Sequence, residues 1–133
     1  MDPLIRNIEV RFAKAVASLE KALELGTLLE HAERDAALLR FELAAELMPK
    51  LLRRILSSRG ADVSLPKDAV RAARSADLAD EATASVLLAA IDDRNRMVHD
   101  YSEGFSEALF ARVRTEYFPA FRDLSSRLKT GSI

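Results

Sequence analysis

Residues 91–101 have the sequence IDDRNRMVHDY, and the interpretation of the whole chain starts from this stretch. It contains two arginines, an amide, one of the two histidines and one of the two tyrosines of the chain. At about 3.6 residues per turn, the stretch and the residues before it divide into two helical faces. The first face is Leu87, Ile91, Arg94, Val98 and Tyr101. Arg94 interrupts this apolar face, where a cation is costly unless an anion meets it.

The second face carries Leu88, Asp92, Asn95 and His99. Arg94 and His99 are five residues apart, so an ideal helix directs them roughly 140° away from each other. One substrate can meet both if the helix frays near its end, or if two copies of the segment face each other. We favour a symmetric homodimer, because a two-fold axis brings the Arg94 of one copy beside the His99 of the other.

The rest of the chain predicts an all-α protein. Apolar residues recur at helical spacing, and no stretch alternates apolar and polar residues long enough to indicate a strand. Pro66 suits a first helical turn, and Asp80 and Ser102 suit N-cap positions. The expected helices cover residues 4–25, 27–58, 66–75, 81–99 and 103–129. Short connections then favour an antiparallel up-and-down four-helix bundle with one additional short helix, formed by residues 1–133 as a single domain.

The second helix is the longest of these. Thr27 and Glu30 have the spacing of a capping box that would open it. Pro49 lies in its interior, but the apolar spacing continues beyond the proline, so we expect a bend there rather than an end. The residues expected to face the core are Leu28, Ala32, Leu39, Leu43 and Leu47.

Composition limits the possible functions. The chain has no cysteine, which excludes disulfides and thiolate metal sites. Because no leader and no run of eighteen apolar residues occurs, we expect a cytoplasmic protein without a membrane partner. The net charge of −1 argues against a globally basic nucleic-acid binder. Residues 51–75, however, carry six Lys or Arg against two Asp, either as a patch that contacts a nucleic-acid backbone or as a solvated surface.

The chemistry that remains is metal-free phosphoryl transfer on RNA. His31 and His99 are far apart in sequence, with no further metal-ligand motif, and no Gly-rich phosphate loop is present. RNA supplies its own nucleophile, the 2′-hydroxyl, so a protein need only move protons and stabilise charge. His99 suits the acid or base, Arg94 the charge, and Asn95 the orientation of the imidazole. The alternative is structural: His99 and Tyr101 merely end the helix, and Arg94 pairs with a carboxylate.

Arg94, Asn95, His99 and Tyr101 match the Arg-x4-His-x-Tyr signature of the HEPN superfamily. The segments RFE (40–42), PKDAVR (66–71) and EYFP (116–119) resemble, in order and spacing, the branch of nucleotidyltransferase substrate-binding proteins. Two positions depart from that pattern. Pro49 stands where a large aromatic or aliphatic residue is usual, and Val98 stands where a small hydroxyl residue often precedes the histidine.

The resemblance implies a homodimeric helical bundle with both motifs at an interface cleft. It implies a ribonuclease toxin in which Arg94 binds the scissile phosphate and His99 is the acid or base, without metal or cofactor. Asn95 is the polar residue usual after the arginine. The implied partner is a minimal nucleotidyltransferase, an antitoxin that adenylylates Tyr101.

Outside the motif's signature positions, we expect Arg96, Arg53 and Arg54 to contact RNA or a nucleotide. Two alternatives stay open. One is a non-catalytic subunit that presents a nucleotide substrate to the transferase, and the other is a helical dimer scaffold in which the motif is structural.

Overall fold

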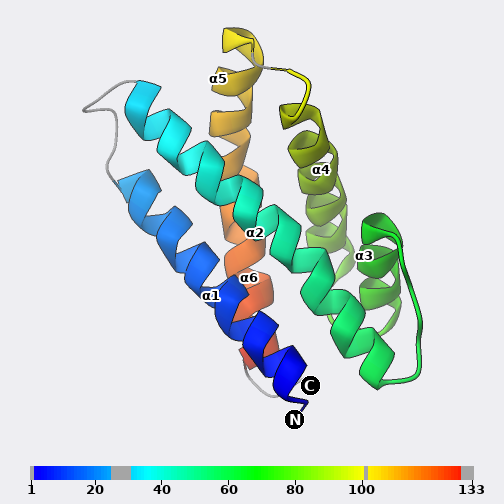
Figure 1. Cartoon of the computed structure of the whole chain (residues 1–133). Helices are drawn as coiled ribbons and strands as arrows, with labels where there is room; N and C mark the ends of the chain where they lie inside the picture. Colours follow the sequence, from blue (N-terminus) through cyan, green and yellow to red (C-terminus); the bar gives the residue numbers. More distant parts are fainter. Residues whose placement is uncertain (1, 25–30, 101, 130–133) are drawn as a thin grey trace.

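The computed structural model describes residues 2–24, 31–100 and 102–129, and all regular structure in these ranges is helical (Figure 1). This confirms the expected all-α class. The elements are α1 (Pro3–Glu24), α2 (His31–Ser58), α3 (Pro66–Ser75), α4 (Glu81–Met97), α5 (Glu103–Arg112), the π-helical segment η1 (Val113–Tyr117) and α6 (Phe118–Lys129). None of the described helices is long and apolar enough to cross a lipid bilayer.

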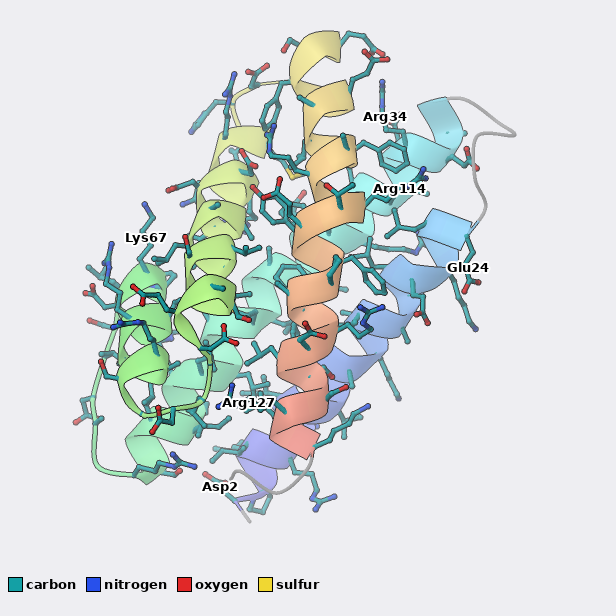
Figure 2. The ribbon with its side chains drawn as sticks, turned by 180° about the vertical axis from the view of Figure 1, so that it is seen from behind. Asp2, Glu24, Arg34, Lys67, Arg114 and Arg127 are labelled. Atoms are coloured by element: carbon teal, nitrogen blue, oxygen red, sulfur yellow. The ribbon has the colours of Figure 1, made fainter. Side chains whose placement is uncertain are left out.

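The helices form a bundle around α2. In Figure 1, α2 crosses the front, with α1 along one side, α3 and α4 along the other, and α5, η1 and α6 behind. Surface ion pairs join neighbouring elements. Lys67 of α3 pairs with Asp92 of α4, and Arg34 of α2 pairs with Glu103 of α5; Lys67 and Arg34 are labelled in Figure 2. The short helix α3 also packs directly against α4, the helix that carries the motif.

Aromatic side chains form the centre of the core. The Phe41 ring of α2 stacks on Tyr117 with centroids 5.3 Å apart and on Phe121 with centroids 6.0 Å apart. Phe12 of α1 meets Phe121 edge-on at 6.1 Å. Burial of each such side chain contributes roughly 1.5–3 kcal/mol, so this cluster fixes α1, α2 and the C-terminal helices relative to one another.

Three described helix starts agree with the predicted signals. Pro66 begins α3, the Asp80 carboxylate accepts the Thr83 amide at 2.7 Å, and the Ser102 hydroxyl accepts the Phe105 amide at 3.3 Å. The predicted capping box at residues 27–30 lies outside the described residues. The fourth helix ends at Met97, two residues earlier than predicted.

The buried face of α2 differs from the prediction. Leu47 is buried as expected, but Ala32 is exposed and the exposed fractions of Leu39 and Leu43 are 66% and 47%. Leu28 lies outside the described residues. The other buried apolar residues of this part of the helix are Ala37, Leu38, Phe41, Ala44, Ala45 and Met48. The prediction was wrong because the stacking of Phe41 on Tyr117 and Phe121 sets the rotation of α2, and this turns the Leu39–Leu43 line outward.

Two other features concern helix continuity. α2 runs without interruption through Pro49, so the helix does not end there, as expected, and the bend at this position stays a prediction. The last helix, expected to be continuous over 103–129, contains the π-helical turn Val113–Tyr117 between α5 and α6. A π turn inserts one residue into the helical repeat, so the positions after it are rotated relative to α5. Both Val113 and Tyr117 are buried.

Candidate functional site

Arg94 lies where its helical face leaves the core. Ile91, one turn earlier, is 4% exposed, whereas Val98, one turn later, is 51% exposed. The Arg94 side chain, with 31% of its surface accessible, lines a small pocket of about 130 Å³ between α2 and α4. The lining residues are Ala45, Glu46, Pro49, Lys50, Arg53, Pro66, Ile91, Arg94 and Asn95. This pocket brings together three of the predicted site residues: Arg94, Asn95 and Arg53.

The contacts of Arg94 leave part of its guanidinium unused. Its Nη2 lies 3.9 Å from the Glu46 carboxylate, a long ion pair, and its Nη1 donates to the Asn95 side-chain oxygen at 3.5 Å. The buried Nε has no hydrogen-bond partner among the described residues. Asn95 therefore contacts Arg94, and not the imidazole that it was expected to orient.

His99 lies beyond the end of α4 and outside this pocket. Its backbone amide donates to the Arg96 carbonyl at 3.0 Å, which closes a turn after Met97. The imidazole is exposed, and no described residue forms a hydrogen bond with it. One copy of the chain thus places Arg94 and His99 in different surroundings. Tyr101, the predicted modification site, lies outside the described residues.

The other predicted contacts with RNA have different environments. Arg96 pairs with Asp100 at 2.9 Å, and its guanidinium carbon lies 4.4 Å from the centroid of the Phe105 ring. Hydrogen bonds from Ser102, and then from Arg96, lower the pKa of Asp100 below its ordinary value. These contacts hold the turn between α4 and α5. Arg54 is exposed on α2 and is not among the lining residues of the pocket.

A polar network beside the motif was missed at the sequence level. Asp93, one residue before Arg94, accepts hydrogen bonds from the Tyr117 hydroxyl and from the Arg112 Nε, the latter at 2.8 Å. Burial, reinforced by the Asp93 carboxylate, raises the pKa of Tyr117. The hydrogen bond to Asp93 raises the pKa of Arg112. The sequence contained one signal for this network: Asp93 follows the apolar residue Ala90 by three positions. Ala90 is buried in the structure, so this helical spacing directs the Asp93 carboxylate toward the core.

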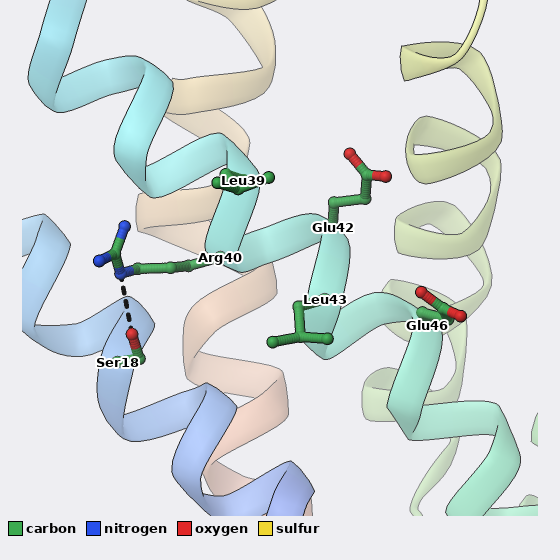
Figure 3. A pocket seen from close by; sticks show the side chains of 6 residues that line it. All are labelled: Ser18, Leu39, Arg40, Glu42, Leu43 and Glu46. Carbon is green, nitrogen blue, oxygen red and sulfur yellow. Dashed lines mark hydrogen bonds between the residues drawn. The ribbon is translucent and has the colours of Figure 1, made fainter.

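A larger groove of about 410 Å³ lies on the outer face of α2 against α1 (Figure 3). It is lined by Ser18, Leu39, Arg40, Glu42, Leu43 and Glu46. The Arg40 Nε donates to the Ser18 hydroxyl at 2.8 Å and joins α2 to α1 there. Glu46 lines both this groove and the Arg94 pocket, so the two hollows are adjacent.

Across the described parts of the chain, no group of three or more His, Asp or Glu side chains is arranged to hold a metal ion.

Comparison with known proteins identifies the family of this chain. The sequence profile of the family described as "Nucleotidyltransferase substrate binding protein like" matches residues 9–130. The chain belongs to this family. The match spans the motif and both walls of the Arg94 pocket, and it agrees with the resemblance to the nucleotidyltransferase substrate-binding branch. No curated protein sequence matches the chain significantly.

Solved structures share the fold of this family member. A protein of Thermus thermophilus is 31% identical, with a TM-score of 0.72 over 91% of this chain and 98% of that one. A tri-AMPylated HEPN toxin of Shewanella oneidensis, in complex with an MNT antitoxin, is 16% identical, with a TM-score of 0.80 over 98% and 99%. A toxin–antitoxin structure with AMP-PNP is 14% identical, with a TM-score of 0.81 over 97% and 98%. Because their sequence identities to this chain are so low, the last two structures show a shared HEPN-like fold and no more.

Proposed function

We propose that the protein is the HEPN component of a toxin–antitoxin pair and acts as a metal-independent endoribonuclease. The observation that carries this proposal is the environment of the Arg94 side chain. Its guanidinium lines a cationic pocket with an unused buried Nε, and the open imidazole of His99 follows on the same segment. A permanent cation for developing phosphorane charge and an imidazole that can accept or donate a proton are the two groups that the proposed RNA cleavage uses.

In the proposed reaction, the ribose 2′-oxygen attacks the adjacent phosphorus and the bond to the 5′-oxygen breaks. His99 acts at one end of this proton transfer and water at the other. Either the imidazole removes the 2′-hydroxyl proton and water protonates the departing 5′-oxygen, or the imidazolium protonates that oxygen and water takes the 2′-hydroxyl proton. Arg94 neutralises the charge on the non-bridging oxygens. The products are a 2′,3′-cyclic phosphate and a free 5′-hydroxyl, and no metal enters the proton balance.

The proposal includes a homodimer of antiparallel up-and-down bundles, each formed by residues 1–133 as one domain. Support comes from the separation of Arg94 and His99 within one copy, because a two-fold axis can place the Arg94 of one copy beside the His99 of the other. Exposed Leu39 and Leu43 lie along the groove that adjoins the Arg94 pocket, and this face is where we place the contact. Apolar side chains are common at the centre of homodimer interfaces.

The proposed partner is a minimal nucleotidyltransferase, an antitoxin that adenylylates Tyr101 in the cytoplasm. Support comes from the fold shared with toxin–antitoxin structures, in one of which the HEPN toxin is AMPylated. Tyr101 follows His99 by two positions in the sequence. A bulky anion on Tyr101 would therefore exclude RNA from the cleft that contains His99. Arg53, Arg54 and Arg96 are proposed as additional contacts with RNA.

The family description favours a second candidate, a non-catalytic subunit that presents a nucleotide substrate to the transferase. This subunit would bind its partner and nucleotide but would leave RNA intact. The two functions are separated by one assay: incubation of the purified protein with RNA in EDTA.

In that assay, wild-type protein should cleave RNA, whereas Arg94→Gln and His99→Ala should each lose the activity by about a hundredfold or more. Both variants should retain the wild-type melting temperature, because both side chains are at least partly exposed. Intact RNA with wild-type protein that still binds the transferase would favour the non-catalytic subunit.

A further inference from the structure

We propose that the small pocket between α2 and α4 binds a single phosphate group of the RNA strand, and that Glu46 is a resident anion which this phosphate displaces. The inference rests on the proposed function. It adds two residues outside the motif, Glu46 and Lys50, to the site, and it gives Arg53 a defined place.

The charge of the pocket is the first argument. Its lining includes the cations Lys50, Arg53 and Arg94 but a single carboxylate, Glu46. The Lys50 Nζ lies 3.3 Å from one Glu46 oxygen, and the Arg94 Nη2 lies 3.9 Å from the other. One carboxylate thus spans two cations with its two oxygens, as two oxygens of a phosphate would.

Unused hydrogen-bond donors are the second argument. The Nε atoms of Arg53 and Arg94 are buried and have no partner among the described residues. The Arg53 Nη1 donates to the Ser64 carbonyl at 3.0 Å, so the guanidinium is held in place before any ligand arrives. A buried donor without an acceptor is unfavourable. A phosphate group presents more acceptor oxygens than a carboxylate, and arginine's planar set of donors matches it well.

Size and exposure are the third argument. Ligand pockets for whole small molecules usually have roughly 300–1,000 Å³. At about 130 Å³, this pocket suits one phosphate group and leaves the sugar and base outside. The Glu46 and Lys50 side chains are 44% and 48% exposed, and pairs of this kind are weak in water. The Glu46 carboxylate is therefore weakly held, and a phosphate group of RNA can take its place between the two cations.

Titration with inorganic phosphate at constant ionic strength, followed by NMR of backbone amides, tests this proposal. Glu46→Gln should bind phosphate about three- to tenfold more tightly, because the competing charge is removed while the shape is kept. Arg53→Gln and Lys50→Gln should each bind it more weakly by a similar factor. Matched controls are Glu42→Gln, an acid of the same helix that does not line the Arg94 pocket, and Arg122→Gln, an exposed arginine of α6. Both should bind as wild type does.

The proposal is overturned if Glu46→Gln leaves phosphate affinity unchanged or weaker, or if Arg53→Gln has no more effect than Arg122→Gln. These results are independent of catalysis. Phosphate binding with the predicted variant order, but with no RNA cleavage by wild type, would sustain the phosphate site and reject the ribonuclease. RNA cleavage that needs Arg94, combined with phosphate affinity indifferent to Glu46 and Arg53, would reject this inference and leave the ribonuclease in place.

Discussion

At the scale of single residues, Arg94 shows what a sequence can reveal about a site. An arginine in an apolar helical face is conspicuous, and the structure places it at the edge of the core in a cationic pocket. Its surroundings were not predictable from spacing. Glu46 and Arg53 lie more than forty positions earlier in the chain, and only the packing of α2 against α4 brings them to Arg94.

Asp93 carries the first stability prediction. Asp93→Asn removes the charge that the Arg112 guanidinium and the Tyr117 hydroxyl contact, and it leaves a partly buried cation without its anion. We expect a loss of about 1–3 kcal/mol in the free energy of unfolding, measured in urea. The matched control is Asp92→Asn, whose side chain is 62% exposed; it should change stability by less than about 0.5 kcal/mol. If Asp93→Asn lowers the free energy of unfolding as little as Asp92→Asn does, the contacts of Asp93 do not stabilise the fold.

At the scale of elements, α2 shows why a correct helix prediction gave the wrong face. Two apolar lines run along this helix, one through Leu39 and Leu43 and another through Phe41 and Met48. Spacing alone does not decide between them, since both repeat at about 3.6 residues. The aromatic residues of η1 and α6 that stack on Phe41 determine which line faces the core, and they are distant in sequence.

Neighbouring leucines of α2 test this assignment directly. Leu38 is 7% exposed and Leu39 is 66% exposed. Leu38→Ala should lower the free energy of unfolding by about 2–4 kcal/mol through the cavity it leaves. Leu39→Ala should lower it by less than about 0.5 kcal/mol, measured in dilute protein where self-association does not contribute. The reverse order would return α2 to the rotation predicted from the sequence.

The N-cap of α4 gives a pH prediction. Hydrogen bonds from Thr83 lower the pKa of Asp80 in the folded protein. A carboxyl group with a lowered folded pKa stabilises the protein above its unfolded pKa, near about 4, and this contribution is lost as pH falls through the folded value. Asp80→Asn keeps a capping oxygen but cannot titrate, so its melting temperature should fall less steeply than wild type below about pH 4. Parallel curves for the two proteins would contradict this.

At the scale of the whole molecule, the helix order and most boundaries followed from caps, prolines and apolar spacing. The π turn at residues 113–117 did not, because its cause is a tertiary contact: Tyr117 both stacks on Phe41 and reaches Asp93. The candidate site was predictable to the level of its motif. The separation of His99 from Arg94 was predicted from helical spacing, whereas the end of α4 at Met97, two residues before His99, was not.

The proposed homodimer gives a prediction for self-association. Leu43 is 47% exposed along the groove beside the Arg94 pocket. Leu43→Glu should shift sedimentation from dimer toward monomer, because an unpaired charge would be buried in each copy of the interface. RNA cleavage should fall in parallel. The control is Leu4→Glu on α1, where a leucine is 56% exposed away from this groove; a dimer that persists with Leu43→Glu would move the interface elsewhere.

Mixing two inactive variants tests the shared site most directly. Arg94→Gln and His99→Ala proteins are unfolded together, refolded as a mixture and assayed for RNA cleavage in EDTA. If each site joins Arg94 of one protomer to His99 of its partner, a mixed dimer regains one intact site. Since about half of the dimers are mixed, about one quarter of wild-type activity should return. A mixture that stays as inactive as each variant alone, beside active wild-type protein, would contradict the account.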